Sequence, residues 1–172
     1  MCIRDRQKLT PFLWFDDKAE EAAEFYVEVF NGRPGSSEES KILGVSRYGE
    51  AGPGTPGTAM TASFVLEGLE FTALNGGPEF AFTEATSFHV SCESQDEVDH
   101  FWKALTDGGE ESQCGWLKDR YGLSWQIIPT ALSELLGDPD PGRSQRALQA
   151  MLQMRKIEID ELQRAYDGVA VS

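Results

Sequence analysis

One pattern occurs twice along this chain: an apolar run typical of a strand, an amphipathic helix, and a glycine that ends the helix. Phe88 lies 76 residues after Phe12, and this single offset also superposes the apolar helix positions. The superposed pairs are Trp14 with Val90, Phe25 with Phe101, Tyr26 with Trp102, Val29 with Leu105, and Gly32 with Gly108. Apolar residues at three- and four-residue spacing predict one buried helix face. The offset therefore indicates an internal duplication.

The first copy begins with the apolar run Leu9 to Phe15, which predicts a strand. Asp16 and Asp17 are N-cap candidates for the helix that follows, and Gly32 ends that helix. The segment beyond it is rich in Gly, Pro and Ser, so we expect loops and short strands there. Three strands are predicted, the last two as a hairpin: Ile42 to Tyr48, Thr58 to Leu66, and Leu69 to Leu74.

The second copy repeats this order with the strand Thr86 to Cys92 and a helix capped by Ser94. The buried face of this helix is predicted to contain Val98, Phe101, Trp102 and Leu105. Two short strands are predicted after the helix, at Gln113 to Leu117 and at Leu123 to Ile128. Pro129 then opens a different region, in which three helices are expected. They span Thr130 to Leu136, Arg143 to Met154, and Ile159 to Tyr166.

These patterns divide the chain into an N-terminal tail or sequence scar (1–7), paired modules (8–128) and a helical extension (129–168). Residues 8–75 and 85–128 are the two modules. At 172 residues the chain is long enough to bury a sizeable core. No run approaches the roughly 18 apolar residues of a membrane span.

Charge and cysteine content exclude several kinds of partner. The formal charge of −14 opposes a phosphate backbone, so we expect no nucleic-acid partner. Cys2, Cys92 and Cys114 are odd in number and form no CxxC pair, which indicates neither a disulfide framework nor a zinc knuckle. A reducing, cytoplasmic location is expected, with no membrane partner.

Four stretches of the chain resemble the PhnB-like branch of the vicinal-oxygen-chelate superfamily, also called glyoxalase, bleomycin-resistance and dioxygenase proteins. This branch is often labelled after a 3-demethylubiquinone-9 3-methyltransferase. The stretches are TPFLWFDDKAEEAAEFYVEVF, FTALNGGPEFAFTEATSF, GGEESQCGWLKDRYGLSWQIIPTALSELL and QAMLQMRKIEIDEL. The long QCGWLKDRYGLSWQIIP block is the most specific of them.

The resemblance implies an α+β fold. Two βαβββ modules would form a U-shaped, partly closed mixed sheet with helices outside, and the C-terminal helices would be added to it. It further implies a ligand cleft on the concave face and a homodimer. Because the helix Arg143 to Met154 presents Ala147, Leu148, Met151 and Leu152 on one face, we expect a second subunit to cover that face. Met154, Ile157 and Ile159 lie just beyond it.

Strand alternation predicts which side chains face the cleft. In the fifth strand Phe88, Val90 and Cys92 are expected toward the helices, and Ser87, His89 and Ser91 toward the cleft. The same offset places Phe12 and Trp14 toward the helices of the first module. The cleft-facing residues of its first strand are then expected to be Pro11, Leu13 and Phe15.

Metal-dependent members of the superfamily place His and Glu on the first and last strands of each module. The matching residues here are Pro11, Thr72, Ser87 and Gln126. Because transition metals need about three imidazole, carboxylate or thiolate ligands, we expect no tightly bound metal and no cofactor.

Two further polar residues are candidates for the cleft. His89 is a candidate general base or hydrogen-bond donor, or else a polar side chain satisfied by a neighbour or water. Asn75, before Gly76-Gly77, is a candidate ligand contact or part of a plain turn. Pro78 to Phe82 follow these glycines where a nucleotide-binding loop requires a helix, so no methyl-donor site is visible.

Three functions remain open. The first is a metal-independent protein that binds a small, partly apolar molecule in the cleft. The second is a lyase, isomerase or dioxygenase that acts on vicinal oxygens and uses His89 and Gln126 with a weakly bound or substrate-borne metal. The third is a protein whose C-terminal helices serve chiefly in assembly. The missing carboxylate ligands favour the first or the third.

Overall fold

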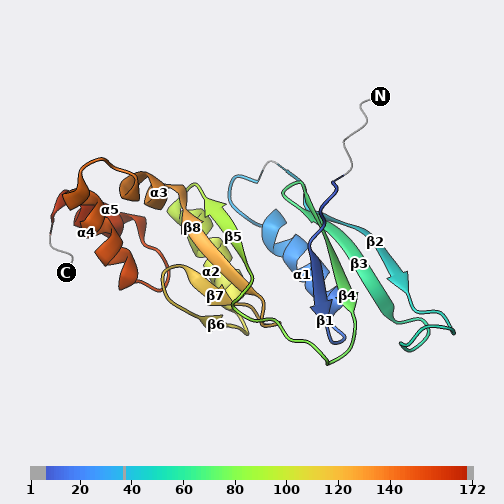
Figure 1. Ribbon diagram of the computed structural model, residues 1–172. Coiled ribbons are helices and arrows are strands. Elements are labelled where there is room, and N and C mark those ends of the chain that lie inside the picture. The colour runs from blue at the N-terminus through green and yellow to red at the C-terminus, as the bar shows by residue number, and fades with distance from the viewer. Residues whose placement is uncertain (1–6, 37, 170–172) are drawn as a thin grey trace. The chain divides into compact units, whose positions relative to one another are not determined.

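The computed structural model describes residues 7–36 and 38–169. The chain forms two compact units, which divide between Ala81 and Phe82. Each unit contains one four-stranded sheet with a helix against one face (Figure 1). The C-terminal helices belong to the second unit.

The first unit contains one helix and four strands. Its elements are β1 (Phe12–Phe15), α1 (Ala19–Asn31), β2 (Lys41–Arg47), β3 (Ala59–Leu66) and β4 (Leu69–Asn75). The strand order is β1-β4-β3-β2, with β1 parallel to β4 and the other pairs antiparallel. Tyr26 of α1 packs against Phe64 of β3, with ring centroids 6.2 Å apart, so this face of the sheet carries the core.

The second unit repeats the same arrangement. Its elements are β5 (Ser87–Cys92), α2 (Gln95–Thr106), β6 (Glu110–Glu111), β7 (Trp116–Lys118) and β8 (Ser124–Pro129). Its order, β5-β8-β7-β6, matches that of the first sheet, and β5 is parallel to β8 as β1 is to β4. The predicted duplication into two βαβββ modules is therefore confirmed. The closing of all strands into one U-shaped sheet stays a prediction.

The two helices start differently. Ser94 accepts a hydrogen bond from the Glu97 amide at 3.2 Å and caps α2 as predicted. The prediction that Asp16 or Asp17 caps α1 is wrong, because the N-cap residue is Lys18 and its side chain makes no capping bond. The Ala19 amide instead donates to Asn75 Oδ1, an acceptor supplied by β4.

Three helices follow the second sheet: α3 (Thr130–Leu136), α4 (Pro141–Leu152) and α5 (Ile159–Asp167). Helix α4 begins two residues before the predicted Arg143, because Asp140 caps it and a proline fits its first position. The helices and the segment between α4 and α5 enclose an apolar cluster of Leu132, Met154, Ile157 and Leu162.

The segment between α4 and α5 is hydrogen-bonded to the second module. The Cys114 amide donates to Met154 O and the Gly115 amide to Arg155 O, both at 2.8 Å. Gln95, in the first turn of α2, accepts from the Ile159 amide at 2.8 Å and donates to Ile157 O at 3.1 Å. The extension is therefore part of the fold of the second unit.

This packing changes the expectation for α4. Ala147, for which the sequence predicts a subunit contact, is buried within the chain. Met154 and Ile157, just beyond this face, are buried in the C-terminal apolar cluster. Leu148 and Leu152 stay exposed. The homodimer itself stays a prediction.

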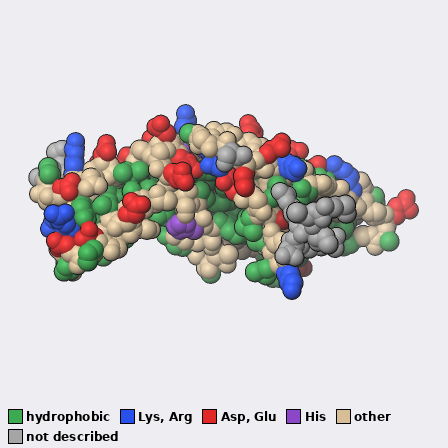
Figure 2. All heavy atoms as spheres, turned by 90° about the horizontal axis from the view of Figure 1, so that it is seen from above, with side chains coloured by type: hydrophobic (Ala, Val, Ile, Leu, Met, Phe, Trp, Pro, Cys, Tyr) green, Lys and Arg blue, Asp and Glu red, His purple; other side chains and the backbone are tan. Residues whose placement is uncertain are grey.

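Acidic side chains are scattered over the face of the molecule that Figure 2 shows, and they gather in no single patch there. This distribution accompanies the formal charge of −14. Within residues 7–36 and 38–169, no helix has the length and apolar character needed to cross a membrane.

Candidate functional site: the open face of the second sheet

The face of the second sheet opposite α2 carries most of the sequence-predicted polar residues. Strand partners in register share a face. His89 pairs with Gln126, whereas Phe88 pairs with the buried Trp125, so the two sets lie on opposite faces. The register thus separates His89 from the helix side of β5, while its place in a ligand cleft stays a prediction. We define the open face as Ser87, His89, Ser91, Glu110, Trp116, Lys118, Ser124, Gln126 and Ile128.

Two of the predicted residues meet directly on this face. Gln126 Nε2 donates to Ser87 Oγ at 2.8 Å, and both side chains are half-buried. His89 is exposed beside Gln126, with its Nδ1 3.5 Å from Ser91 Oγ. A molecule lying on this face can therefore contact an imidazole, an amide and a hydroxyl without any change in the sheet.

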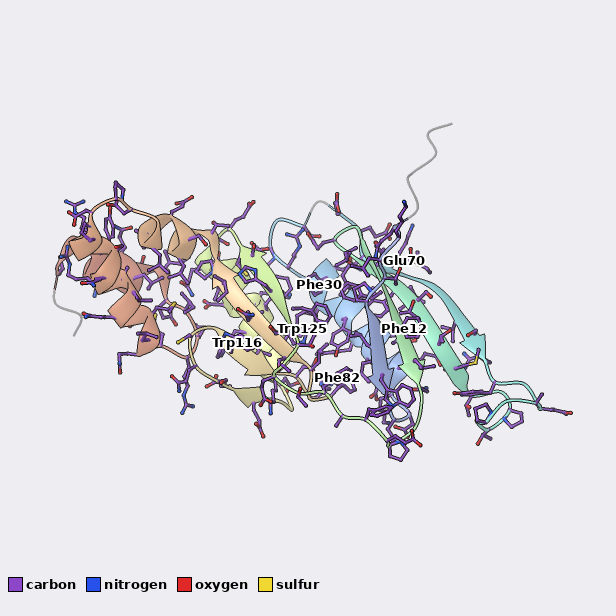
Figure 3. The ribbon with its side chains drawn as sticks, viewed as in Figure 1. Phe12, Phe30, Glu70, Phe82, Trp116 and Trp125 are labelled. Carbon is purple, nitrogen blue, oxygen red and sulfur yellow. The ribbon has the colours of Figure 1, made fainter. Side chains whose placement is uncertain are left out.

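The far end of β8 is covered. Ile128 packs against the C-terminal apolar cluster, so the extension limits the open face at this end. Trp116, on β7, pairs with Gln126 and presents its indole on the open face, whereas Trp125 lies on the helix face (Figure 3). The Trp116 indole therefore lies beside the side-chain amide of Gln126.

A small cavity of about 120 Å³ lies near the other end of β7 and β8. Its walls include Glu84, Glu110, Trp116, Lys118 and Ser124. The sequence analysis did not single out Ser124, although alternation along β8 from Gln126 predicts that the two residues share a face. The contact of Glu84 with Lys118 joins residues far apart in sequence, and nothing in the sequence pattern indicated it.

In the first module the predicted facing of β1 is wrong. Leu13 and Phe15, expected in the cleft, are 6% and 4% exposed, and Leu13 pairs with the fully buried Ala73 on the α1 side. Phe12, expected toward the helix, is 61% exposed. Pro11 lies just before the strand and is half-buried, and its carbonyl accepts from the Thr72 amide at 3.0 Å.

The cause is the length of the strand-to-helix connection. Three residues, 16–18, separate β1 from α1, but only 93 and 94 separate β5 from α2. Because strand side chains alternate, one extra residue reverses every side chain of the strand while the helices keep their offset. The open face of the first sheet therefore contains Phe12 and Trp14, together with Thr72, which pairs with Phe12.

Asn75 has a structural role that the sequence did not indicate. Its Oδ1 accepts from the Ala19 amide at 2.8 Å, and its Nδ2 donates to Ala59 O at 3.0 Å. The Tyr48 hydroxyl donates to Asn75 O at 2.6 Å. The side-chain amide is thus used within the first module. Asn75 also lines a cavity of about 570 Å³ at this end of the sheet, together with Asp16, Glu20 and Arg47.

The residues at the expected metal positions do not fit a transition metal. These residues, Pro11, Thr72, Ser87 and Gln126, supply no imidazole, carboxylate or thiolate. His89, which pairs with Gln126 in the sheet register, adds one imidazole to the set. This set provides one imidazole and no carboxylate or thiolate, whereas such ions need about three such ligands. Among the residues that the structure describes, no group of three His, Cys, Asp or Glu side chains is placed to hold a metal ion.

Comparison with known proteins identifies the family. Residues 7–128 match the sequence profile of the 3-demethylubiquinone-9 3-methyltransferase family. A PhnB protein from Bacillus cereus is 38% identical, with a TM-score of 0.63 over 72% of this chain and 100% of that chain. The chain belongs to this PhnB-like family.

A second structure, protein PA1353 from Pseudomonas aeruginosa, is 19% identical and has a TM-score of 0.56. The aligned region covers 72% of this chain and 97% of the Pseudomonas protein, and at this identity the likeness supports the fold alone. No curated protein matches the chain. The family profile ends at residue 128, so the C-terminal extension lies outside it.

The family's methyltransferase name implies a methyl donor, which the residues after β4 do not fit. Nucleotide-like cofactors are held where a glycine turn leads directly into a helix N-terminus. Here Gly76 and Gly77 lead into residues 78–86, which contain no helix. Gly76 instead lies against the Trp14 indole, which donates from Nε1 to Gly77 O at 2.9 Å. These glycines serve packing in the first module.

Proposed function

We propose that this PhnB-like protein binds a small, partly apolar molecule on the open face of β5 to β8, without a tightly bound metal. The observation that carries the proposal is the chemistry of that face. His89, Gln126 and Ser87 offer hydrogen-bonding groups, and Trp116 offers aromatic area beside them. A few convergent polar groups beside an apolar wall are typical of small-molecule sites.

The metal-free part of the proposal rests on ligand type. An exposed imidazole and a neutral amide bind zinc, nickel or iron weakly when no carboxylate or thiolate completes the set. We therefore expect hydrogen bonds and aromatic contact to hold the molecule.

A second candidate function is catalysis of the lyase, isomerase or dioxygenase type. The exposed position of His89 supports it, because the imidazole can reach a bound molecule and take or donate a proton. Replacing His89 by Gln separates the two functions. A binding protein keeps its ligand with a modest loss of affinity, whereas an enzyme of this type loses turnover and keeps binding.

A fragment titration by two-dimensional NMR tests the binding proposal. Small aromatic amides are added to full-length, isotope-labelled protein that has been treated with chelator. We expect shifts at His89, Gln126 and the Trp116 indole, and unchanged signals on the α2 side, for example at Lys103. Shifts confined to other surfaces would overturn the proposal.

We also propose that the protein forms a homodimer through α4, on which Leu148 and Leu152 are exposed. Light scattering on the double variant Leu148→Glu, Leu152→Glu tests it. A wild-type dimer and a monomeric variant are expected. A wild-type monomer at micromolar concentration would refute the dimer.

A further inference from the structure

The cavity beside β7 and β8 contains a buried hydroxyl that has no partner. Ser124 is 1% exposed, and its Oγ forms no hydrogen bond with any residue that the structure describes. A buried polar atom without a partner is costly, and such atoms in native proteins often mark a site for water or a ligand. Ser124 lines the cavity of about 120 Å³, which is large enough for a small functional group.

Lys118 lies beside this hydroxyl. It pairs with Ser124 in the sheet register, so both side chains belong to the open face. Among the described open-face residues of β5 to β8, Lys118 is the one with a permanent positive charge. Trp116, two residues earlier, lines the same cavity and adds aromatic area.

The ammonium group of Lys118 already holds a carboxylate. Its partner is Glu84, which comes from the irregular segment before β5 and is 62% exposed at its side chain. The hydrogen bond from Lys118 and the backbone hydrogen bond lower the pKa of the Glu84 carboxyl, and the bond to Glu84 raises the pKa of Lys118. Exposed ion pairs of this kind contribute little stability, so another carboxylate can replace this one.

We propose that Lys118 and Ser124 form a carboxylate-binding subsite, which Glu84 occupies until an anionic ligand displaces it. The subsite rests on the proposed function and deepens it, because it makes the ligand a small, partly apolar carboxylic acid. The incoming carboxylate accepts from Lys118 Nζ, as Glu84 does, and also from Ser124 Oγ, which Glu84 leaves without a partner. The apolar part of the ligand lies against Trp116.

Charge on the neighbouring strand limits the affinity. Glu110 pairs with Lys118 in the register and is exposed on the same face. Its negative charge opposes an anion in the subsite. Removing that charge should therefore strengthen anion binding, and removing the charge of Glu84 should strengthen it further, because Glu84 competes directly.

Three molecules of similar shape test the charge preference: benzoate, neutral benzamide and cationic benzamidinium. Their affinities for the full chain are measured by the same NMR titration. We expect benzoate to bind best. Glu84→Gln should tighten benzoate binding about threefold, and Lys118→Met should weaken it about tenfold, to the level of benzamide. Lys103→Met, on the outer side of α2, is the matched control and should change nothing.

Ser124→Ala adds a readout that a structural role would not give. The variant removes a buried group without a partner, so the stability of the free protein should stay unchanged or rise, while benzoate affinity falls about threefold. Equal binding of all three molecules at Trp116 and Gln126, or no effect of the Glu84 and Lys118 variants, would overturn the subsite and leave the proposed function standing. Shifts at neither residue with any of the molecules would overturn both.

Discussion

The side chain of Asn75, at the end of β4, caps helix α1, because its Oδ1 accepts a hydrogen bond from the Ala19 amide at 2.8 Å. Its Nδ2 donates to Ala59 O at 3.0 Å, so one amide joins the helix start to two strands. We predict that Asn75→Ala destabilises the first module by about 2 kcal/mol, since a cap and a second hydrogen bond are lost. Urea unfolding measures this loss.

Asn75→Asp is the matched control for the first effect. A carboxylate still accepts from the Ala19 amide but cannot donate to Ala59 O. The loss should then be smaller than in Asn75→Ala. Equal stability of Asn75→Ala and the wild type would show that the bond has no energetic role.

The reversal of β1 shows what the sequence pattern could and could not predict. The apolar pattern predicted the two helices of the modules, because residues such as Phe25, Tyr26 and Val29 recur at helical spacing. It did not predict the two-residue strand β6, which is too short to show a pattern. The facing of Leu13 depended on the length of the connection before α1. One residue there decides the face, and no periodic signal reports it.

The candidate site was predictable in part for the same reason. Ser87, His89 and Gln126 lie on regular strands, so alternation was enough to predict that they share one face of the sheet. The contacts of Glu84 and Asn75 are long-range, and they depend on where irregular segments return in space. Local sequence patterns do not contain this information.

The turn between β7 and β8 depends on a buried carboxylate. Asp119 Oδ1 accepts from the amides of Tyr121 and Leu123, and Oδ2 accepts from Trp125 Nε1 at 2.9 Å. We predict that Asp119→Ala costs about 3 kcal/mol, because two buried donors and one half-buried donor lose a charged acceptor. Chemical denaturation measures this, and Asp107→Asn, at an exposed ion pair, is the control. A loss no larger than that of the control would contradict the prediction.

Gly115 lies where the C-terminal extension packs closely against the second module. Its φ is +83°, and an added Cβ would lie 2.7 Å from Ile128 Cδ1, 2.8 Å from Ile127 O and 3.2 Å from Ile157 Cγ1. Gly115→Ala should therefore destabilise the second unit by more than about 2 kcal/mol, from backbone strain and overpacking together.

Gly122→Ala is the matched control for this variant. Its φ is +87°, but nothing lies within 4 Å of an added Cβ, so strain of about 1 kcal/mol is the whole effect. The difference between the two variants reports the packing of Gly115 against Ile127, Ile128 and Ile157. Identical losses would contradict the close packing that the structure shows.

Asp99 and Lys156 make one connection between α2 and the extension sensitive to acid. Burial raises the pKa of Asp99, but hydrogen bonds from Lys156 and Gln95 outweigh it, and the pKa lies below its usual 3.8. A carboxyl group whose pKa is lower in the folded state stabilises the fold at pH values above its pKa in the unfolded chain. This stabilisation is lost as the pH falls through the pKa of the folded state.

The stability difference between the wild type and Asp99→Asn should therefore be constant near neutral pH and shrink below about pH 4. Urea unfolding of both proteins, once near neutral pH and once below about pH 4, measures this difference. A difference that grows on acidification would reverse the predicted sign.

The binding of a small molecule to the open face of β5 to β8 without metal is tested most directly by one titration under two conditions. Untagged protein is dialysed, analysed for metal content, and titrated with benzoate in chelator and then in excess zinc. We predict no stoichiometric metal after dialysis, equal affinity in both solutions, and the same shifts at Gln126 and Trp116. Near-unit metal occupancy that survives dialysis, with binding lost in chelator, would contradict this account.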